Sequence, residues 1–259
     1  MENKKLILLD IDGTLFDNKN RIVSLKSIEA IKQLHENHII AIATGRSGYM
    51  LDSINEVKPL IDYYILINGQ YIQAHRKTIF KEPLDQTLLY RLVTRMNQLG
   101  LAYGFENNYH EAVSQTNGLV LQGFHRLGLP VPPVDPLFYR HHEVYQAWAF
   151  SDPETIAYLK AEFLELSFIQ WMDVGYDIIP KQASKGRGMI RLVNHLQMDM
   201  ANVIAIGDGD NDYEMVRDAG MGVAMGNATE KVKSVAKYIT TDVTKDGVYN
   251  ALAFLKLIK

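Results

Sequence analysis

The chain has 259 residues, of which 47% are hydrophobic and 22% charged, a composition typical of folded globular proteins and unlike disordered or collagen-like chains. Its length exceeds an ordinary domain of roughly 100–200 residues, which predicts one large domain or two smaller ones. The net charge of −3 gives no electrostatic reason to bind nucleic acid, and no apolar run approaches the ~18 residues that a membrane helix needs. The absence of cysteine excludes disulfides and thiolate chemistry, and it favours a cytoplasmic location.

The first part of the chain alternates short apolar runs with a helical stretch. Continuous apolar runs are typical of parallel strands that helices cover on both faces. Between the first two runs, apolar residues at helical spacing predict a helix with Ser24 as its N-cap. The predicted strands are residues 5–9, 39–43 and 65–67, and the helix carries Leu25, Ile28, Ile31 and Leu34 on one face.

The middle of the chain, residues 83–183, differs in character. Two helical stripes and two strand-like pieces flank a proline-rich loop at 128–136, whose prolines do not suit a central strand or a helix interior. The first stripe is Leu88, Leu92, Met96 and Leu99, the second is Ile156, Leu159, Phe163 and Leu166, and the strand-like pieces are residues 147–150 and 168–172. We expect this segment to be an α+β module inserted into another domain. Several of its aromatic residues should pack its own core.

The last part returns to alternating elements. A helix around 189–196 leads into a strand at 203–206, and a helix at 212–218 leads into a strand at 221–224. This pattern at both chain ends predicts an α/β fold, a doubly wound parallel sheet built from residues 1–82 and 184–259.

Polar residues follow directly after four of the predicted strands. Open α/β sheets bind ligands at the carboxyl ends of their strands, so these residues should meet on one edge of the sheet. Several carboxylates there would repel one another unless they share a cation, and hard oxygen ligands suit Mg²⁺. The clusters are Asp10 to Thr14, Thr44 to Arg46, Asn68 with Gly69, and Gly207 to Asp212.

These clusters resemble the four signature motifs of the haloacid dehalogenase-like phosphohydrolase superfamily. The chain has Asp10-x-Asp12-Gly13-Thr14, Thr44-Gly45-Arg46, Lys185-Gly186 and Gly207-Asp208-x-x-Asn211-Asp212 in that order, and further likeness at residues 224–228 and 246–248. The combination is similar to the Cof-type subfamily with a type IIB αβ cap between the second and third motifs. About 140 residues separate Thr44 from Lys185, far too many for a structureless loop.

The resemblance implies roles for these residues. Asp10 would attack phosphorus and form an aspartyl-phosphate, and Asp12 would act as general acid and then as general base. Thr44 and Lys185 would bind phosphate oxygens. Mg²⁺ would be held by the Asp10 carboxylate, the Asp12 backbone carbonyl and Asp208, with Asp212 on the metal side or behind the ligands. Candidates for substrate or phosphate contacts are Gly45, Arg46, Asn68, Gly69 and Asn211. Arg46 could instead pair with a carboxylate of the core.

Other chemistries fit the sequence less well. A calcium loop starting at Asp208 or Asp10 lacks the required Gly at its sixth and Glu at its twelfth position. Gly207-x-Gly209 lacks the third glycine of a dinucleotide fingerprint. No nucleophile-elbow signature is present, and His141-His142-Glu143 lacks the spacing of a helical metal pair.

The sequence therefore predicts a Mg²⁺-dependent phosphatase that hydrolyses a small phosphorylated metabolite, such as a sugar phosphate or a phosphorylated cofactor, with residues 83–183 deciding the substrate. The alternatives are a phosphotransferase or phosphomutase on the same fold, and a catalytically silent metabolite-binding module. We expect a small-molecule phosphate ester as partner, no nucleic acid, no membrane, and a monomer or weak homodimer.

Overall fold

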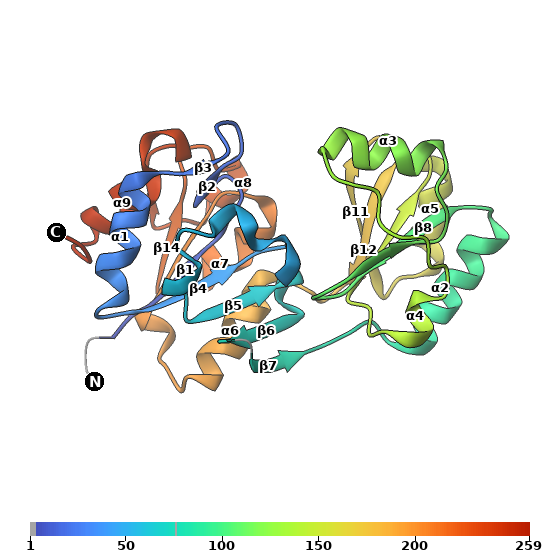
Figure 1. Ribbon diagram of the computed structural model, residues 1–259. Coiled ribbons are helices and arrows are strands. Elements are labelled where there is room, and N and C mark those ends of the chain that lie inside the picture. The colour runs from blue at the N-terminus through green and yellow to red at the C-terminus, as the bar shows by residue number, and fades with distance from the viewer. Residues whose placement is uncertain (1–3, 76) are drawn as a thin grey trace. The chain divides into compact units, whose positions relative to one another are not determined.

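The computed structural model describes residues 4–75 and 77–259. The chain divides into two compact units. Unit 1 comprises Met1–Lys81 with Ser184–Lys259, and unit 2 comprises Glu82–Ala183, which is the green and yellow part of the chain in Figure 1.

Unit 1 is built on an eight-stranded sheet whose order is β15-β14-β13-β1-β4-β5-β6-β7. The six strands from β15 to β5 pair in parallel, whereas β6 and β7 pair antiparallel at one edge. The central strands are continuous apolar runs, and they are buried except at Ile39, which is half-buried. The strands are β1 (Leu6–Leu9), β4 (Ile39–Ala43), β5 (Tyr63–Leu66), β6 (Tyr71–Ala74), β7 (Lys77–Lys81), β13 (Val203–Gly207), β14 (Met221–Ala224) and β15 (Tyr238–Ile239).

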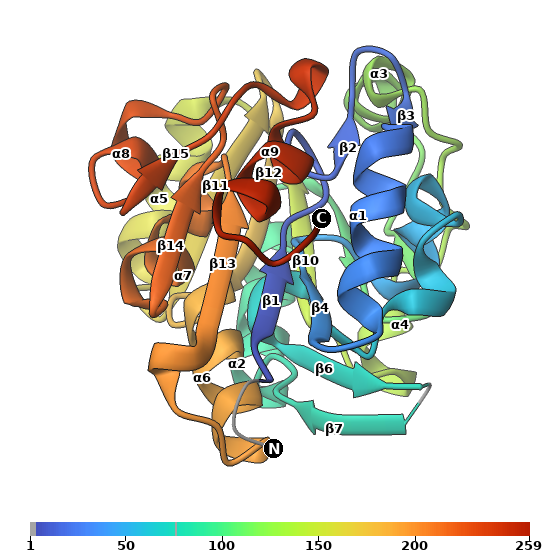
Figure 2. The same cartoon turned by 90° about the vertical axis from the view of Figure 1, so that its left-hand side faces the viewer.

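Helices cover both faces of this sheet, as Figures 1 and 2 show. Helix α1 packs with α9 and against β4, while α6 and α7 pack together and contact β4 and β13 respectively. A short hairpin of β2 and β3 follows the end of β1. These elements are α1 (Leu25–His35), α6 (Lys185–His195), α7 (Tyr213–Asp218), α8 (Glu230–Lys233), α9 (Gly247–Phe254), β2 (Phe16–Asp17) and β3 (Ile22–Val23).

Unit 2 contains a five-stranded antiparallel sheet of order β11-β12-β10-β8-β9. One apolar cluster joins residues of α2 and α5 to one face of this sheet, and a second cluster joins α3 to the other face. The elements are α2 (Gln86–Gln98), β8 (Ala102–Glu106), β9 (Glu111–Val113), α3 (Gly118–Leu127), α4 (Phe138–His141), β10 (Gln146–Phe150), α5 (Pro153–Glu162), β11 (Leu166–Met172) and β12 (Gly175–Pro180).

The predicted α/β fold is confirmed, and so is the N-cap of α1, where the Ser24 side chain accepts the backbone N–H of Ser27. Two details of the prediction were wrong. Helix α5 ends at Glu162, and Leu166 begins β11, because a shared apolar spacing cannot distinguish a helix end from the strand after it. The predicted strand 65–67 is β5 and ends at Leu66, since Ile67 has a φ of 49°.

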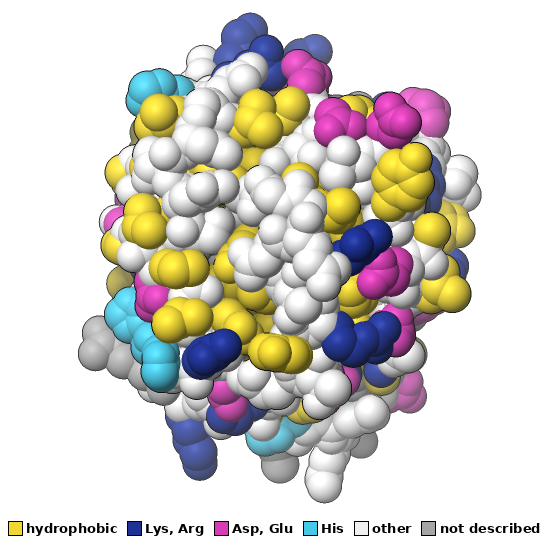
Figure 3. Space-filling model, turned by 90° about the vertical axis from the view of Figure 1, so that its right-hand side faces the viewer, with side chains coloured by type: hydrophobic (Ala, Val, Ile, Leu, Met, Phe, Trp, Pro, Cys, Tyr) yellow, Lys and Arg dark blue, Asp and Glu magenta, His cyan; other side chains and the backbone are white. Residues whose placement is uncertain are grey.

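The surface carries both signs of charge. On the face of the molecule seen in Figure 3, basic and acidic side chains are interspersed with apolar ones. None of the helices in the described part of the chain has the length and apolar character needed to cross a membrane.

Candidate active site

The residues that follow β1, β4, β5 and β13 lie at one edge of the unit 1 sheet. These four strands are parallel neighbours in the order β13-β1-β4-β5, so their carboxyl ends point the same way. Asp10 comes directly after β1, Thr44 after β4 and Asp208 after β13. Chain order also reverses here, because β4 and β13 flank β1 from opposite ends of the sequence, which is where open α/β sheets bind ligands.

A buried lysine joins two of the predicted carboxylates. The Lys185 Nζ donates to Oδ1 of Asp10 and to Oδ1 of Asp212, both at 2.6 Å, and the lysine side chain is only 1% exposed. It sits in the first turn of α6, which begins there because the Ser184 side chain accepts the Arg187 N–H as a cap. Burial alone would lower the pKa of Lys185, but the two carboxylates raise it, so the lysine stays charged.

Asp10 is a buried carboxyl group whose pKa is raised. Burial raises its pKa well above the ordinary value, the charge of Asp212 raises it further, and Lys185 opposes both. The Oδ1 atom accepts the lysine proton, while Oδ2 has no hydrogen-bond donor among the residues that the structure describes. One oxygen is therefore anchored, and the other is free to bind a cation or attack an electrophile.

Asp212 is held on both oxygens. Its Oδ1 accepts from Lys185, and its Oδ2 accepts the backbone N–H groups of Asp208 and Gly209 at 2.9 Å each. Its side chain is completely buried. Asp212 thus fixes the loop after β13 and balances the charge of the lysine.

Asp208 completes an acidic cluster with Asp10 and Asp212. One ligand oxygen from each lies within 4.8 Å of the others. Burial raises the pKa of Asp208 to about 6, and a hydrogen bond from the Thr14 hydroxyl at 2.8 Å opposes this rise. Burial is the main cause of the raised pKa values of Asp10 and Asp208, with the neighbouring carboxylates adding to it, and the all-oxygen donor set suits a hard divalent cation.

Asp12 lies outside this cluster and pairs with Arg46. The guanidinium makes two hydrogen bonds to the carboxylate, Nε to Oδ2 at 2.7 Å and Nη2 to Oδ1 at 2.5 Å. Arg46 is itself held by the Met50 carbonyl and the Ser53 hydroxyl. The Asp12 side chain is 40% exposed, so its carboxylate remains accessible to solvent and ligand. Arg46 therefore pairs with Asp12, a carboxylate of the core, which was the alternative to substrate binding.

The remaining predicted site residues surround the end of β4. Thr44 is buried, and its hydroxyl accepts the Arg46 N–H at 3.1 Å. Asn68 has a left-handed backbone and accepts a hydrogen bond from the Asn211 side chain at 3.2 Å. A Cβ on Gly45 would lie 3.3 Å from the Asn68 amide. Gly69 has a packing role, since a Cβ there would lie 2.2 Å from the Ser184 carbonyl oxygen at the start of α6.

Two contacts of the site were not assigned from the sequence. Thr14 belongs to the first motif, but its hydroxyl donates to Asp208, which lies 194 positions away in the sequence. Local spacing could not predict this contact. Asn227 lies in the 224–228 stretch that resembles the family, and it donates to the Gly13 carbonyl and to Asp208. In the sequence, Asn227 was marked only by its position within that stretch, which gave it no role.

Comparison with known proteins agrees with this geometry. Residues 7–252 match the family described as haloacid dehalogenase-like hydrolase. The Bacillus subtilis protein named "Putative phosphatase YkrA" is 32% identical over 260 residues, which span 99% of this chain and 100% of YkrA. The pyridoxal phosphate phosphatase YbhA of Escherichia coli is 29% identical over 265 residues, 94% of this chain and 96% of YbhA.

A solved structure is also similar over nearly the whole length. BT1666 of Bacteroides thetaiotaomicron, a phosphatase of the same superfamily, superimposes with a TM-score of 0.90 at 31% identity, covering 98% of this chain and 96% of BT1666. The chain therefore belongs to the haloacid dehalogenase-like hydrolases of the Cof type. It is a phosphoric monoester hydrolase, and the acidic cluster fits the divalent metal that this family generally uses.

Proposed function

We propose that this protein is a Mg²⁺-dependent phosphatase that hydrolyses a small phosphorylated metabolite through an aspartyl-phosphate on Asp10. The observation that carries the proposal is the state of Asp10. This carboxylate is buried, one oxygen is anchored by Lys185 at 2.6 Å, and the other has no donor within residues 4–75 and 77–259. Such a group is fixed in orientation and keeps one oxygen available as a nucleophile.

In the first step, the free oxygen of Asp10 forms a bond to phosphorus while the bond from phosphorus to the leaving oxygen breaks. Lys185 and Thr44 hold phosphate oxygens, and Lys185 offsets the negative charge that accumulates. Gly45, Arg46, Asn68, Gly69 and Asn211 are the further candidates for contacts to phosphate or substrate. In the second step, water attacks the aspartyl-phosphate and releases inorganic phosphate and Asp10.

Asp12 serves both steps as an acid and then as a base. It gives a proton to the leaving oxygen, and afterwards it takes one from the attacking water. Its carboxylate accepts two hydrogen bonds from Arg46, which fix its orientation for both proton transfers.

Mg²⁺ is the metal that fits the donor set best, because all its ligands would be oxygens. Asp10, Asp208 and the Asp12 carbonyl would hold it, with Asp212 as the carboxylate behind them. When bound, the metal supplies positive charge that lets the phosphate anion approach the Asp10 carboxylate. Burial raises the pKa values of Asp10 and Asp208, and the nearby carboxylates raise them further; a bound cation would favour the charged form of both groups.

Unit 2 would select the leaving group. Relatives of similar length include a sugar phosphatase, BT4131 of subclass IIB, and a pyridoxal phosphate phosphatase, YbhA. We therefore propose sugar phosphates and phosphorylated cofactors as the substrate classes, in a cytoplasmic protein that is a monomer or weak homodimer.

The test is phosphate release from a panel of phosphorylated metabolites with Mg²⁺, comparing wild type with Asp10→Asn. We expect the substitution to lower turnover by on the order of 10⁴-fold or more, because it removes the nucleophile. Asp52→Asn is the matched control, since Asp52 is exposed and only pairs with Lys58, and it should leave turnover unchanged. Near-normal turnover of Asp10→Asn would show that Asp10 is not the nucleophile.

A second measurement separates hydrolysis from transfer to another hydroxyl. In ¹⁸O-labelled water, hydrolysis places one solvent oxygen in each phosphate released. Phosphate without the label would contradict attack by water and favour phosphotransfer.

A further inference from the structure

The Asn227 side chain connects three segments of unit 1 that are far apart in the sequence. Its Nδ2 donates to the Gly13 carbonyl at 2.8 Å and to Oδ2 of Asp208 at 3.2 Å. Its Oδ1 accepts the backbone N–H of Val243 at 2.9 Å. One amide therefore links the loop after β1, the carboxylate after β13 and the turn η6 (Val243–Lys245).

Each partner of Asn227 allows the amide only one orientation. A backbone N–H can only donate, so Oδ1 must face Val243. A backbone carbonyl and a carboxylate without its proton can only accept, so Nδ2 must face Gly13 and Asp208. Aspartate at this position could not donate to either acceptor, and leucine could make none of the three hydrogen bonds.

The Asp208 carboxylate is thereby held from both sides. The Thr14 hydroxyl donates to Oδ1 at 2.8 Å, and Asn227 donates to Oδ2. Gly13 adds a close backbone approach, since a Cβ there would lie 2.3 Å from the Asp208 Oδ2. Both torsions of the Asp208 side chain are therefore fixed by hydrogen bonds and by the adjacent backbone.

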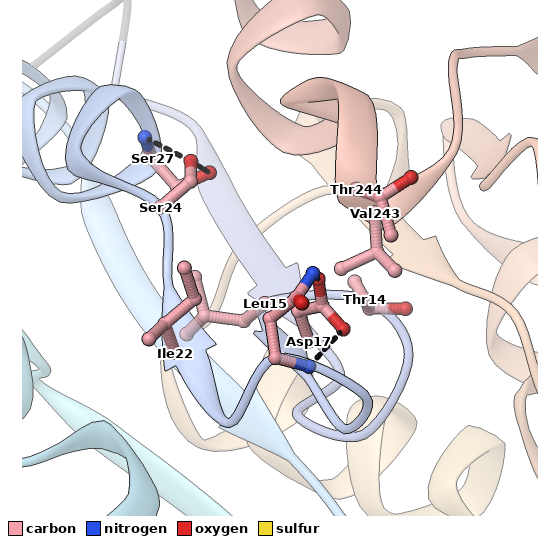
Figure 4. Close-up of a pocket in the computed structure, with 9 residues that line it drawn as sticks. Thr14, Leu15, Asp17, Ile22, Ser24, Ser27, Val243 and Thr244 are labelled. Atoms are coloured by element: carbon pink, nitrogen blue, oxygen red, sulfur yellow. Dashed lines mark hydrogen bonds between the residues drawn. The ribbon is translucent and has the colours of Figure 1, made fainter.

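The two segments that Asn227 joins also border a small pocket. Thr14 and Val243 line this pocket of about 80 Å³, whose other walls include Leu15, Asp17 and Ile22. Figure 4 shows these side chains around it. The amide of Asn227 is a direct polar link between the loop after β1 and the turn η6.

We propose that Asn227 is a positioning residue that orients Asp208 for binding the divalent cation. It acts through its hydrogen bonds to Asp208 and to the Gly13 backbone. This inference rests on the proposed role of Asp208 as a metal ligand. Hydrogen bonds that orient a ligating carboxylate stabilise the arrangement that binds the metal, and their loss weakens metal affinity.

The experiment measures the affinity of the full-length protein for MgCl₂ by isothermal titration calorimetry, without substrate. Asn227→Ala and Asn227→Leu should each weaken Mg²⁺ binding by about 10–100-fold, the leucine variant with side-chain volume retained. The control is Asn250→Ala, which removes hydrogen bonds to Thr241 and to the Lys245 carbonyl near the same turn but makes no contact with Asp208. It should bind Mg²⁺ like wild type.

A second readout distinguishes positioning from a merely structural role. The melting temperature of the metal-free protein should fall no further in Asn227→Leu than in Asn250→Ala, while the Mg²⁺ concentration for half-maximal phosphatase activity rises only in the Asn227 variants. Saturating Mg²⁺ should restore most of kcat.

The outcomes are separable from those of the proposed function. Wild-type protein that binds no Mg²⁺ would contradict the metal site itself. Wild-type binding with unchanged affinity in both Asn227 variants, or equal weakening in Asn250→Ala, would overturn the positioning role and leave the proposed function standing.

Discussion

The two units bury polar groups in opposite ways. In unit 1, Lys185, Asp10 and Asp212 are buried together, and every charge has a partner at hydrogen-bonding distance. In unit 2, aliphatic and aromatic residues pack both faces of the sheet, and Asp177 in β12 is a partly buried carboxyl whose pKa burial raises to about 7. The difference is that unit 1 buries carboxylates against a lysine, whereas burial raises the pKa of Asp177 in unit 2.

We expect the largest loss of stability when Lys185, the cation of the buried cluster, is replaced. Lys185→Met leaves two carboxylates buried without their cation, and we expect the free energy of unfolding to fall by about 3–5 kcal/mol in metal-free protein. Urea denaturation followed by circular dichroism measures this. The control is Lys26→Met, whose exposed pair with Asp246 should contribute less than about 1 kcal/mol. If both variants lost the same free energy of unfolding, the buried cluster would contribute no more to stability than an exposed ion pair.

Mg²⁺ binding should stabilise unit 1, because the acidic cluster of Asp10, Asp208 and Asp212 lies in that unit. Mg²⁺ at 100 times its Kd should stabilise the native protein by about 2.7 kcal/mol through mass action. Thermal melts with Mg²⁺ and with EDTA measure the effect, and Asp208→Asn is expected to abolish it. A wild-type melting temperature that ignores Mg²⁺ would count against the site.

The smallest effect is expected in unit 2, at Asp177. Its folded-state pKa of about 7 lies above the ordinary 3.8, so the folded state binds a proton more tightly than the unfolded state between these values. Stability therefore falls as pH rises from about 4 to 7. Asp177→Asn removes this dependence and should stabilise unit 2 by about 1–2 kcal/mol at pH 8, a value reduced for partial exposure, but hardly at pH 4.

Tryptophan fluorescence measures this change selectively. The protein has two tryptophans, Trp148 and Trp171, and both lie in unit 2. Asp173→Asn is the control, because its carboxylate is 81% exposed. A gain at pH 8 that persists unchanged at pH 4 would contradict the assignment of the effect to the charge of Asp177.

Much of unit 1 could be predicted from local sequence. The apolar runs at 39–43 and 203–206 predicted buried parallel strands, and the polar residues directly after them marked the edge where ligands bind. The strand predictions were confirmed because strand burial and chain direction follow from patterns a few residues long, whereas ligand binding at that edge stays a prediction. The antiparallel edge strands β6 and β7 were not predicted, since their sequences alternate less clearly.

Unit 2 was harder to predict. Strands β8, β9 and β12 were not recognised, and the second helical stripe ran past the end of α5. The face on which Asp177 lies follows from its pairing opposite Trp148 in β10, and strand register is a property of two segments together.

The fold class, the family resemblance and the set of candidate side chains could be read from the sequence, because they depend on spacing and order along the chain. The three-dimensional structure was needed to show which of these side chains meet. Lys185 reaches Asp10 across 175 positions, Arg46 pairs with Asp12, and Asn227 bridges Gly13, Asp208 and Val243. Such contacts depend on how strands and helices pack in three dimensions. Spacing along the chain does not predict the distance in space between residues that are far apart in the sequence.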